Sequence, residues 1–270
     1  MENANIYYEQ YGEGIPLIFL HGYHIDGKCF SIPVERFLQE GNHFCRVYPD
    51  LPGMGRTTLR ERVDTTEKLF NIMLQFIDIV SDYGDFAVVG YSYGGYLARA
   101  LVKHRKERLK GIFLLCPVII PDRGGRLLPD FRIVVEDRDF LCTLDEEERT
   151  FFTGSAVVQT ERVYKRMKKE IIEPFKLADH EMLKDLQKNA YAFEKPIDNL
   201  NHFFEGPVQF LAGRQDSVVG YEDILSIFED YPNGELTILN GAGHNLQIER
   251  EKAFSRIFRN WLKRILFYCG

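Results

Sequence analysis

Along the first part of the chain, a helix-like pattern of apolar residues lies between short strand-like runs. Residues 67–83 carry apolar side chains three and four positions apart, which predicts a helix with one buried face. Short β-branched and aromatic runs, each bounded by Gly, Pro or Asp, predict strands on either side of such a stretch. These runs are 6–11, 17–20, 44–48, 86–89 and 111–116. Strands that alternate with helices indicate a mostly parallel sheet that is covered by helices on both faces.

The alternation stops after Pro117 and resumes at Pro207. Two further strands are predicted at 208–212 and 236–239, and the apolar positions of 249–267 form one stripe along a closing helix. The segment between them has no clear strand alternation, and 32 of its 89 residues are charged. We therefore predict a core of residues 1–117 and 207–270 that is interrupted by a helical cap, or lid, of residues 118–206.

Composition narrows the class of protein. The 270 residues are 45% hydrophobic and 27% charged, which is typical of a soluble globular chain. A net charge of −6 provides no basic surface, so we expect no nucleic-acid partner. The five cysteines include no C-x-x-C pair, which favours a reducing compartment without a zinc or redox site. Without a signal-peptide pattern or a long apolar run, the sequence predicts a cytoplasmic protein with no membrane anchor, and it leaves the oligomeric state open.

A serine stands where a predicted strand passes directly into a helix-compatible segment. Residues 90–94 read Gly-Tyr-Ser-Tyr-Gly, the G-x-S-x-G pattern of a nucleophile elbow around Ser92. Such a turn holds the hydroxyl outward, where a base can reach it, and its glycines allow close backbone packing. The alternative is a glycine-rich turn with a capping serine. The strand before Ser92 favours the nucleophile.

Two further turns follow predicted strands in the first part of the chain. His21-Gly22-Tyr23 comes directly after one strand, and backbone N–H groups there could join the N–H of Tyr93 in an oxyanion hole. We expect His21 itself to be a structural histidine, hydrogen-bonded within its loop. The turn at 50–56 contains a proline and two glycines and is expected to shape a tight strand exit without chemistry.

An acid and a histidine follow the two late strands. Asp216 comes after the strand at 208–212, and His244 comes after the strand at 236–239. The carboxyl ends of parallel strands meet at one edge of a sheet, so both side chains should lie near Ser92. An Asp that caps the next helix and an ordinary loop histidine are the alternatives. Three such residues at strand ends favour a shared site, with Asp122 as the next acid to consider.

Taken together, these motifs resemble those of the α/β-hydrolase family, in the order Ser, acid, His. The resemblance implies a mostly parallel sheet of the eight-stranded type with helices on both faces, and a helical cap at 118–206. It implies Ser92 as nucleophile, His244 as base, Asp216 as its orienting acid, and backbone N–H groups of Tyr23 and Tyr93 as oxyanion donors. Family members that displace halide or open epoxides use aspartate at the elbow, so these activities are not expected here.

The sequence thus predicts a serine hydrolase that acts on a small, hydrophobic carboxylic ester, thioester or amide through an acyl-Ser92 intermediate. A carbon–carbon bond hydrolase with the same triad and a ligand receptor with little turnover are the alternatives. The mechanism needs no metal or organic cofactor. The acidic excess of the cap is expected at the substrate entrance, where it would disfavour anionic substrates. Aromatic residues of the cap are candidate walls of the pocket: Phe131, Phe140, Phe151, Phe152, Phe175, Tyr191, Phe193, Phe203 and Phe204.

Overall fold

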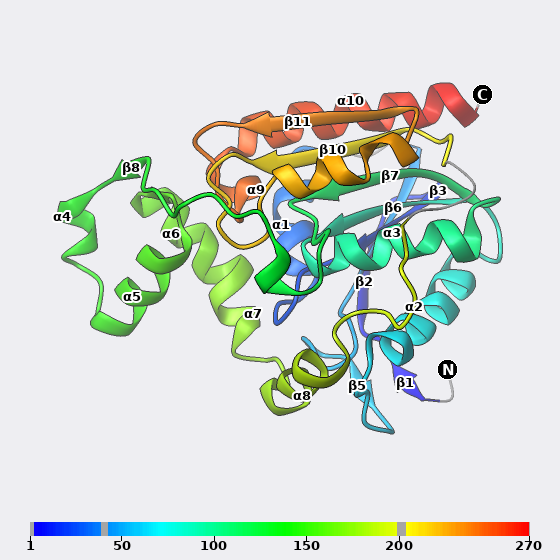
Figure 1. Ribbon diagram of the computed structural model, residues 1–270, viewed down its shortest axis with the longest axis horizontal. Helices are drawn as coiled ribbons and strands as arrows, with labels where there is room; N and C mark the ends of the chain where they lie inside the picture. The colour runs from blue at the N-terminus through cyan, green and yellow to red at the C-terminus, as the bar shows by residue number, and fades with distance from the viewer. Residues whose placement is uncertain (1–2, 39–42, 199–203, 270) are drawn as a thin grey trace.

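A seven-stranded sheet is the centre of the computed structural model, which describes residues 3–38, 43–198 and 204–269 (Figure 1). The strand order is β11-β10-β7-β6-β3-β4-β2, and every neighbouring pair is parallel except β2 with β4. The strands of this sheet are β2 (Tyr8–Tyr11), β3 (Ile15–Leu20), β4 (Phe44–Pro49), β6 (Phe86–Tyr91), β7 (Leu109–Leu115), β10 (Val208–Gly213) and β11 (Gly234–Leu239).

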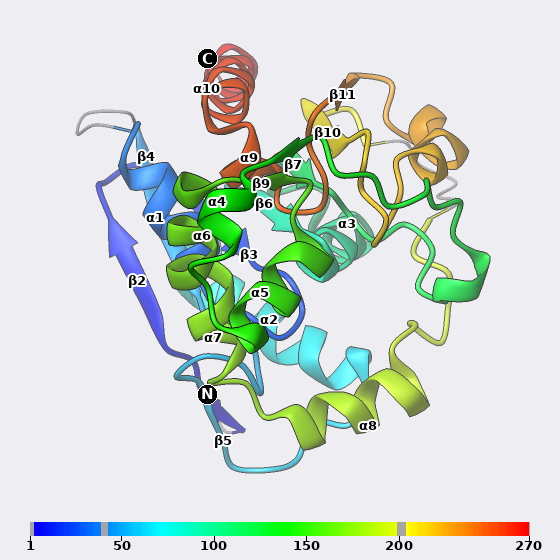
Figure 2. The same cartoon turned by 90° about the vertical axis from the view of Figure 1, so that its left-hand side faces the viewer.

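Helices cover both faces of this sheet, as predicted (Figures 1 and 2). Helices α1 (Lys28–Glu35) and α10 (Glu251–Cys269) lie on one face, and α2 (Thr66–Val80) and α3 (Tyr93–Arg105) lie on the other. Helix α2 begins where the Thr65 side chain accepts a hydrogen bond from the Lys68 N–H, an N-cap that satisfies a free helix donor. Short turns η3 (Glu222–Ser226) and η4 (Phe228–Asp230) connect β10 to β11.

The core between α10 and the sheet is aromatic. Phe113 of β7 lies with its ring centroid 5.0 Å from Phe258 and 5.4 Å from Trp261. The Trp261 indole N–H donates to the Pro207 carbonyl oxygen at 3.1 Å, so the polar atom of this fully buried ring is satisfied. The apolar stripe of the closing helix therefore fixes that helix on the sheet.

The amino-terminal region differs in detail from the prediction. The run at 6–11 forms a strand only from Tyr8, and β1 (Ala4–Asn5) pairs with β5 (Thr58–Leu59) in a separate two-stranded sheet. Seven strands, instead of the eight expected, therefore make up the large sheet in the described part of the chain. The closing helix is also divided, because α9 (Leu246–Glu249) precedes α10.

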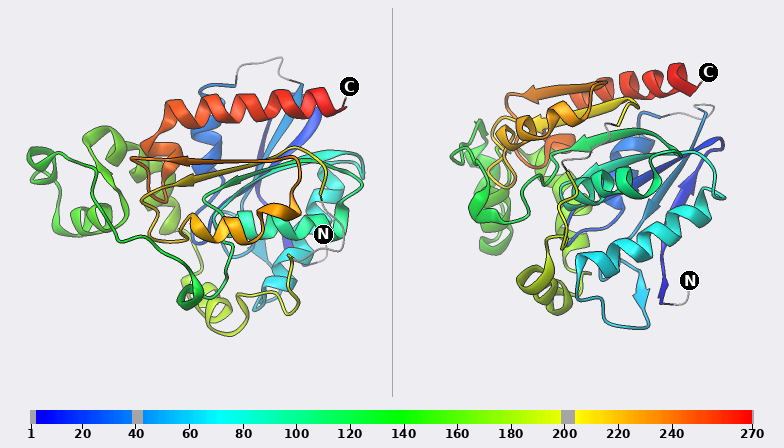
Figure 3. Two further views of the ribbon diagram at one scale, coloured as in Figure 1. Left: turned by 45° about the horizontal axis from the view of Figure 1, so that its top comes forward. Right: turned by 45° about the vertical axis from the view of Figure 1, so that its right-hand side comes forward.

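The described part of the predicted cap adds no strand to the large sheet. Its elements lie beyond the carboxyl ends of the parallel strands (Figures 1 and 3). They are η1 (Arg123–Gly125), β8 (Val135–Glu136), α4 (Arg138–Leu141), α5 (Glu146–Ser155), β9 (Val158–Gln159), α6 (Glu161–Met167), η2 (Lys168–Ile172), α7 (Glu173–Phe175) and α8 (His180–Ala190).

Several hydrogen bonds tie this segment to the rest of the protein, among them one at α8 and one at α9. Near α8, the Tyr23 hydroxyl donates to the Leu183 carbonyl at 2.7 Å. Beside α9, the Arg166 guanidinium donates to the Gln247 carbonyl at 3.2 Å and forms a buried ion pair with Glu170 at 2.7 Å. Its behaviour as a separate, mobile lid stays a prediction.

Candidate active site

Ser92 lies at the sharp turn between β6 and α3. Its φ of 54° and ψ of −115° form a conformation that residues with a Cβ adopt only at an energetic cost. The turn depends on the glycines beside it, because a Cβ at Gly90 would lie 2.5 Å from the Gly94 carbonyl oxygen. The strained turn directs the serine hydroxyl away from the sheet and toward the loop that carries His244.

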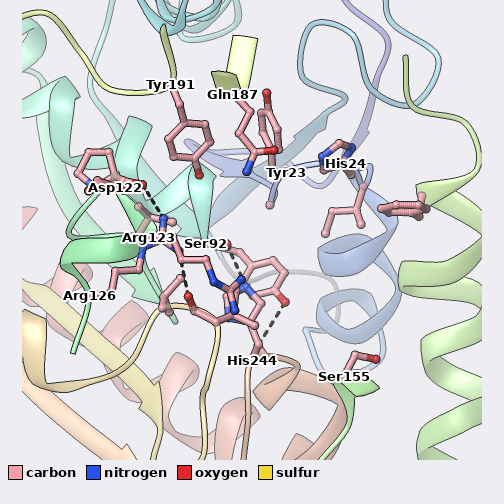
Figure 4. A pocket seen from close by; sticks show the side chains of 18 of the residues that line it. Tyr23, His24, Ser92, Asp122, Arg123, Arg126, Ser155, Gln187, Tyr191 and His244 are labelled. Carbon is pink, nitrogen blue, oxygen red and sulfur yellow. Dashed lines mark hydrogen bonds between the residues drawn. The ribbon is translucent and has the colours of Figure 1, made fainter. Parts of the chain in front are cut away.

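His244 lies within hydrogen-bond distance of both other residues of the expected triad. His244 Nε2 is 3.0 Å from Ser92 Oγ (Figure 4). On the other side of the ring, His244 Nδ1 is 2.8 Å from Asp216 Oδ2. Strand β10 precedes Asp216 and its parallel neighbour β11 precedes His244, so both loops leave the same edge of the sheet. The Tyr91 hydroxyl also donates to the His244 carbonyl at 3.2 Å and holds that loop against β6.

The surroundings of Asp216 define the orientation of the imidazole. Asp216 is fully buried, and its Oδ1 accepts hydrogen bonds from the N–H groups of Val218 at 2.9 Å and Val219 at 3.1 Å. Its Oδ2 is left to accept from His244 Nδ1–H, which leaves the Nε2 lone pair to face Ser92. Asp122 is engaged elsewhere, since its carboxylate accepts from the Gly124 N–H at 3.1 Å.

Of the two expected oxyanion donors, Tyr93 directly follows Ser92 in the chain and Tyr23 lines the same cavity as Ser92. Tyr93 is the first residue of α3, so its N–H lies at a helix N-terminus, where amides have no intrahelical acceptor. Tyr23 lines the cavity from the loop after β3. The Tyr93 phenol is fully buried and hydrogen-bonded to Thr66 Oγ1 at 2.8 Å, so only its backbone can face a bound carbonyl.

A cavity of about 760 Å³ opens above Ser92 and His244. Of the aromatic residues expected in its wall, Phe151, Phe175 and Tyr191 line it. Phe152 and Phe204 are buried away from the cavity instead, and Phe131 is exposed to solvent. The residue type alone does not define the direction in which an aromatic side chain points. Phe140 packs near Tyr164, and Phe193 packs near Phe70, so neither ring lines the cavity. Phe203 lies outside the described residues.

The charge of the cavity lining differs from the sequence-based expectation. Arg123, Arg126 and Lys188 line the cavity, whereas Asp122 is the single carboxylate among its described lining residues. The acidic excess of the cap was expected at the entrance, but acids such as Glu146 and Glu147 lie on the exposed helix α5 instead. Composition counts charges over a whole segment and does not indicate which of them face the site.

Glu249 is a buried acid that sequence reasoning missed. Its Oε2 accepts from the N–H of Gly243, directly before His244, at 2.6 Å, and its Oε1 accepts from the Val157 N–H of the cap segment at 2.8 Å. Burial raises the pKa of this carboxyl, and the backbone hydrogen bonds oppose that rise. One side chain therefore joins the histidine loop to the predicted cap segment. Its position five residues after His244, on the short helix α9, carried no signal by itself.

His21 is structural, in agreement with the sequence analysis. Its Nε2 accepts from the Leu51 N–H at 2.8 Å, so its Nδ1 carries the proton and donates to the Gly22 carbonyl at 2.8 Å. Complete burial lowers the pKa of His21 to about 4. The neutral ring thereby connects the Tyr23 loop to the turn after β4.

We expect the protein to lose stability as the pH falls from about 6.5 to 4. The pKa of His21 is lower in the folded state, so the unfolded chain binds more protons in this window and stability rises with pH. This group alone should reduce the free energy of unfolding by about 2 kcal/mol between pH 7 and pH 5. Urea unfolding at both pH values measures it. His21→Gln keeps an acceptor for Leu51 without titrating, and an equal pH dependence in both proteins would contradict the assignment.

Cys116, Asp216 and His244 form a group of three potential metal ligands in the described part of the chain, with donor atoms within 4.8 Å of one another. The geometry does not suit an ion, because the facing atoms of Asp216 and His244 are hydrogen-bonded to each other. Burial raises the pKa of the Cys116 thiol well above its ordinary value, which opposes the thiolate that a metal requires. We therefore assign no metal to this group.

Comparison with known proteins identifies the class. The model of the alpha/beta hydrolase family matches residues 17–257, so the chain belongs to this family and is an α/β-fold hydrolase. Among the described residues, no helix is both long and apolar enough to cross a membrane.

Several relatives are similar over nearly the whole chain. A pimeloyl-[acyl-carrier protein] methyl ester esterase of Legionella pneumophila is 23% identical, with 96% of this chain and 100% of the relative covered. The crystal structure of an alpha/beta superfamily hydrolase from Oenococcus oeni PSU-1 is 30% identical and has a TM-score of 0.87, with 97% of this chain and 96% of that chain covered. A thermophilic esterase from Thermogutta terrifontis shares the fold at 19% identity, with a TM-score of 0.67 and coverage of 96% and 93%.

Proposed function

We propose that this protein is a serine esterase that hydrolyses a small carboxylic ester through an acyl-Ser92 intermediate. The observation that carries the proposal is the hydrogen-bonded series Asp216, His244, Ser92 at the cavity. A serine hydroxyl is a weak nucleophile, and a neutral imidazole within 3.0 Å can remove its proton during attack. The name of the Legionella relative, an ester hydrolase, supports ester chemistry.

In the first half of the reaction, Ser92 Oγ attacks the ester carbonyl carbon while His244 Nε2 takes the hydroxyl proton. The carbonyl oxygen becomes negative and accepts hydrogen bonds from the backbone N–H groups of Tyr23 and Tyr93. His244 then returns its proton to the departing alcohol, which leaves an ester of Ser92. Asp216 stabilises the imidazolium that forms between these steps.

In the second half, a water molecule attacks the acyl carbon of the Ser92 ester. His244 removes the water proton and gives it to Ser92 Oγ as the carbon–oxygen bond breaks, which releases the carboxylic acid and restores the enzyme. We propose that residues 118–206 act as a cap over this site. Phe151, Phe175 and Ile171 of that segment supply an apolar wall for the hydrocarbon part of the substrate.

A fluorophosphonate probe together with a set of 4-nitrophenyl esters tests this proposal. We expect the probe to label Ser92, located by peptide mass spectrometry, and short-chain acyl esters to be turned over. Labelling and turnover should both disappear in Ser92→Ala. Tight binding of small molecules with no turnover of esters, thioesters or amides would contradict the proposal in favour of a receptor. Cleavage of a β-diketone without cleavage of esters would favour a carbon–carbon hydrolase.

A further inference from the structure

The cavity carries an excess of positive charge beside the proposed nucleophile. Arg123, Arg126 and Lys188 line it together with a single carboxylate, Asp122, among the described residues. Arg123 is the first residue of η1, Arg126 directly follows η1, and Lys188 lies on α8. Figure 4 shows the two arginines on one wall and His24 on the opposite wall, with Ser92 and His244 between them in this view.

Arg126 is a fixed cation. Its guanidinium donates to three backbone carbonyl oxygens, those of Ile120 at 2.8 Å, Pro121 at 2.8 Å and Val218 at 2.9 Å. Carbonyl groups orient the side chain without neutralising its charge. The side chain is half-buried, so water screens the charge less than it would at the surface. Arg126 thus places a fixed cation in this wall, although the nearby Asp223 carboxylate offsets part of its charge.

Arg123 and Lys188 are cations with free donors. In the described part of the chain, neither side chain has a carboxylate within 4 Å or a hydrogen-bond acceptor. Asp122, the neighbouring acid, accepts a hydrogen bond from the Gly124 N–H and forms no ion pair with Arg123 within 4 Å. The planar guanidinium of an arginine binds a carboxylate through two parallel hydrogen bonds, and a lysine adds a point charge. The free donors of Arg123 therefore suit an anionic group on the substrate.

On the basis of the proposed esterase function, we propose that the preferred substrate is an ester that carries a carboxylate, which Arg123 binds with support from Lys188. The apolar wall would then contact the methylene chain between the ester and this carboxylate. Arg123 is a specificity-determining residue in this assignment, because it contacts the substrate away from the reacting carbonyl. The composition of residues 118–206 predicts negative charge at the entrance, whereas the charged side chains that face the cavity are mostly positive.

The test compares monomethyl adipate with methyl hexanoate, which differ in the carboxylate at the far end of the acyl chain. We expect wild-type kcat/KM to be about 10-fold or more higher for monomethyl adipate, from a charged hydrogen bond. Arg123→Gln should lower the ratio of the two kcat/KM values by about 10-fold. Raising the salt concentration from about 0.05 to 0.5 M should lower the wild-type ratio as well, because part of the attraction is screened.

Arg138→Gln is the matched control. Arg138 belongs to the same cap segment, on α4, but it is 84% exposed, pairs with Glu136 and lies outside the cavity lining. The specificity ratio should not change in this variant. Equal changes of the ratio in Arg123→Gln and Arg138→Gln would overturn the inference. A wild-type preference for the neutral ester would also overturn it if that preference holds both in this pair and when the carboxylate lies on the alcohol side.

A second pair of esters locates the carboxylate. In 4-carboxyphenyl hexanoate the carboxylate lies on the alcohol side of the ester, and phenyl hexanoate is the neutral counterpart. A wild-type preference for 4-carboxyphenyl hexanoate that disappears in Arg123→Gln supports the same site with the substrate bound in the opposite orientation. Hydrolysis of only the neutral esters contradicts the inference and leaves the esterase proposal standing. Hydrolysis of neither kind of ester, with no probe attached to Ser92, contradicts the esterase proposal itself.

Discussion

Ester hydrolysis should fall by about 10⁴ to 10⁶ in kcat when any member of the hydrogen-bonded series is replaced. Ser92→Ala removes the attacking oxygen, and His244→Ala removes the base that lies 3.0 Å from it. In Asp216→Asn the amide can donate to His244 Nδ1, which moves the ring proton to Nε2 and prevents that atom from accepting the Ser92 proton. Stopped-assay kcat values on a short-chain ester, with circular dichroism to confirm folding, measure this.

Two control variants sharpen the result. Ser255→Ala removes a partly exposed hydroxyl on α10, whose one hydrogen bond within the described residues is to the Lys252 carbonyl, and it should leave kcat unchanged. Asp122→Asn keeps the hydrogen bond between His244 and Asp216. The decrease in kcat should therefore be at least about 1,000-fold smaller in Asp122→Asn than in Asp216→Asn. A larger loss in Asp122→Asn than in Asp216→Asn would mean that Asp122 is the acid of the triad. Such a result would require the loop after β7 to rearrange.

Replacing Gly94 by alanine should strongly destabilise the fold, which is the second large effect that we expect. A Cβ on Gly94 would lie 1.9 Å from the Leu20 carbonyl oxygen and 2.6 Å from the His21 carbonyl oxygen. Both atoms are backbone at the end of the central strand β3, so no side-chain rotation relieves the overlap. Helix α3 would have to move away from the sheet, at a cost of about 3 kcal/mol or more in the free energy of unfolding.

Gly154→Ala is the matched control for Gly94→Ala. Gly154 lies in helix α5, and a Cβ there would meet no atom within 4 Å. Alanine should stabilise this helix by about 0.5 to 1 kcal/mol, because it loses less backbone entropy than glycine. Thermal and urea unfolding of both variants measure the difference. Similar stability in the two variants would show that the close approach of α3 to β3 is not required.

The order of strands and helices could be predicted because each element has its own periodicity. The run at 44–48 became β4, and the stripe at 67–83 became α2 with its apolar side on the sheet. Prediction was less successful at the amino terminus, where Ala4 and Asn5 pair with Thr58 and Leu59. That pairing depends on residues more than fifty positions away, and no local pattern encodes it.

The candidate site was predictable to the extent that it depends on strand ends. Ser92, Asp216 and His244 each follow a strand, and parallel strands bring their carboxyl ends to one edge. Glu249 could not be found in this way, because its importance comes from two N–H groups on different segments. The aromatic wall was only partly predictable, since Phe151 and Phe152 are adjacent but only Phe151 faces the cavity.

The sequence by itself determined the family, the central sheet with its helices, and the residue types of the candidate triad, because periodicity and short motifs are local properties. The tertiary structure decided which residues of the 118–206 segment face the cavity, how the histidine loop is joined to that segment, and the sign of the charge beside Ser92. These features depend on side-chain direction and on contacts between distant segments. The 118–206 segment, which has more acids than bases, can therefore present Arg123, Arg126 and Lys188 to the candidate site.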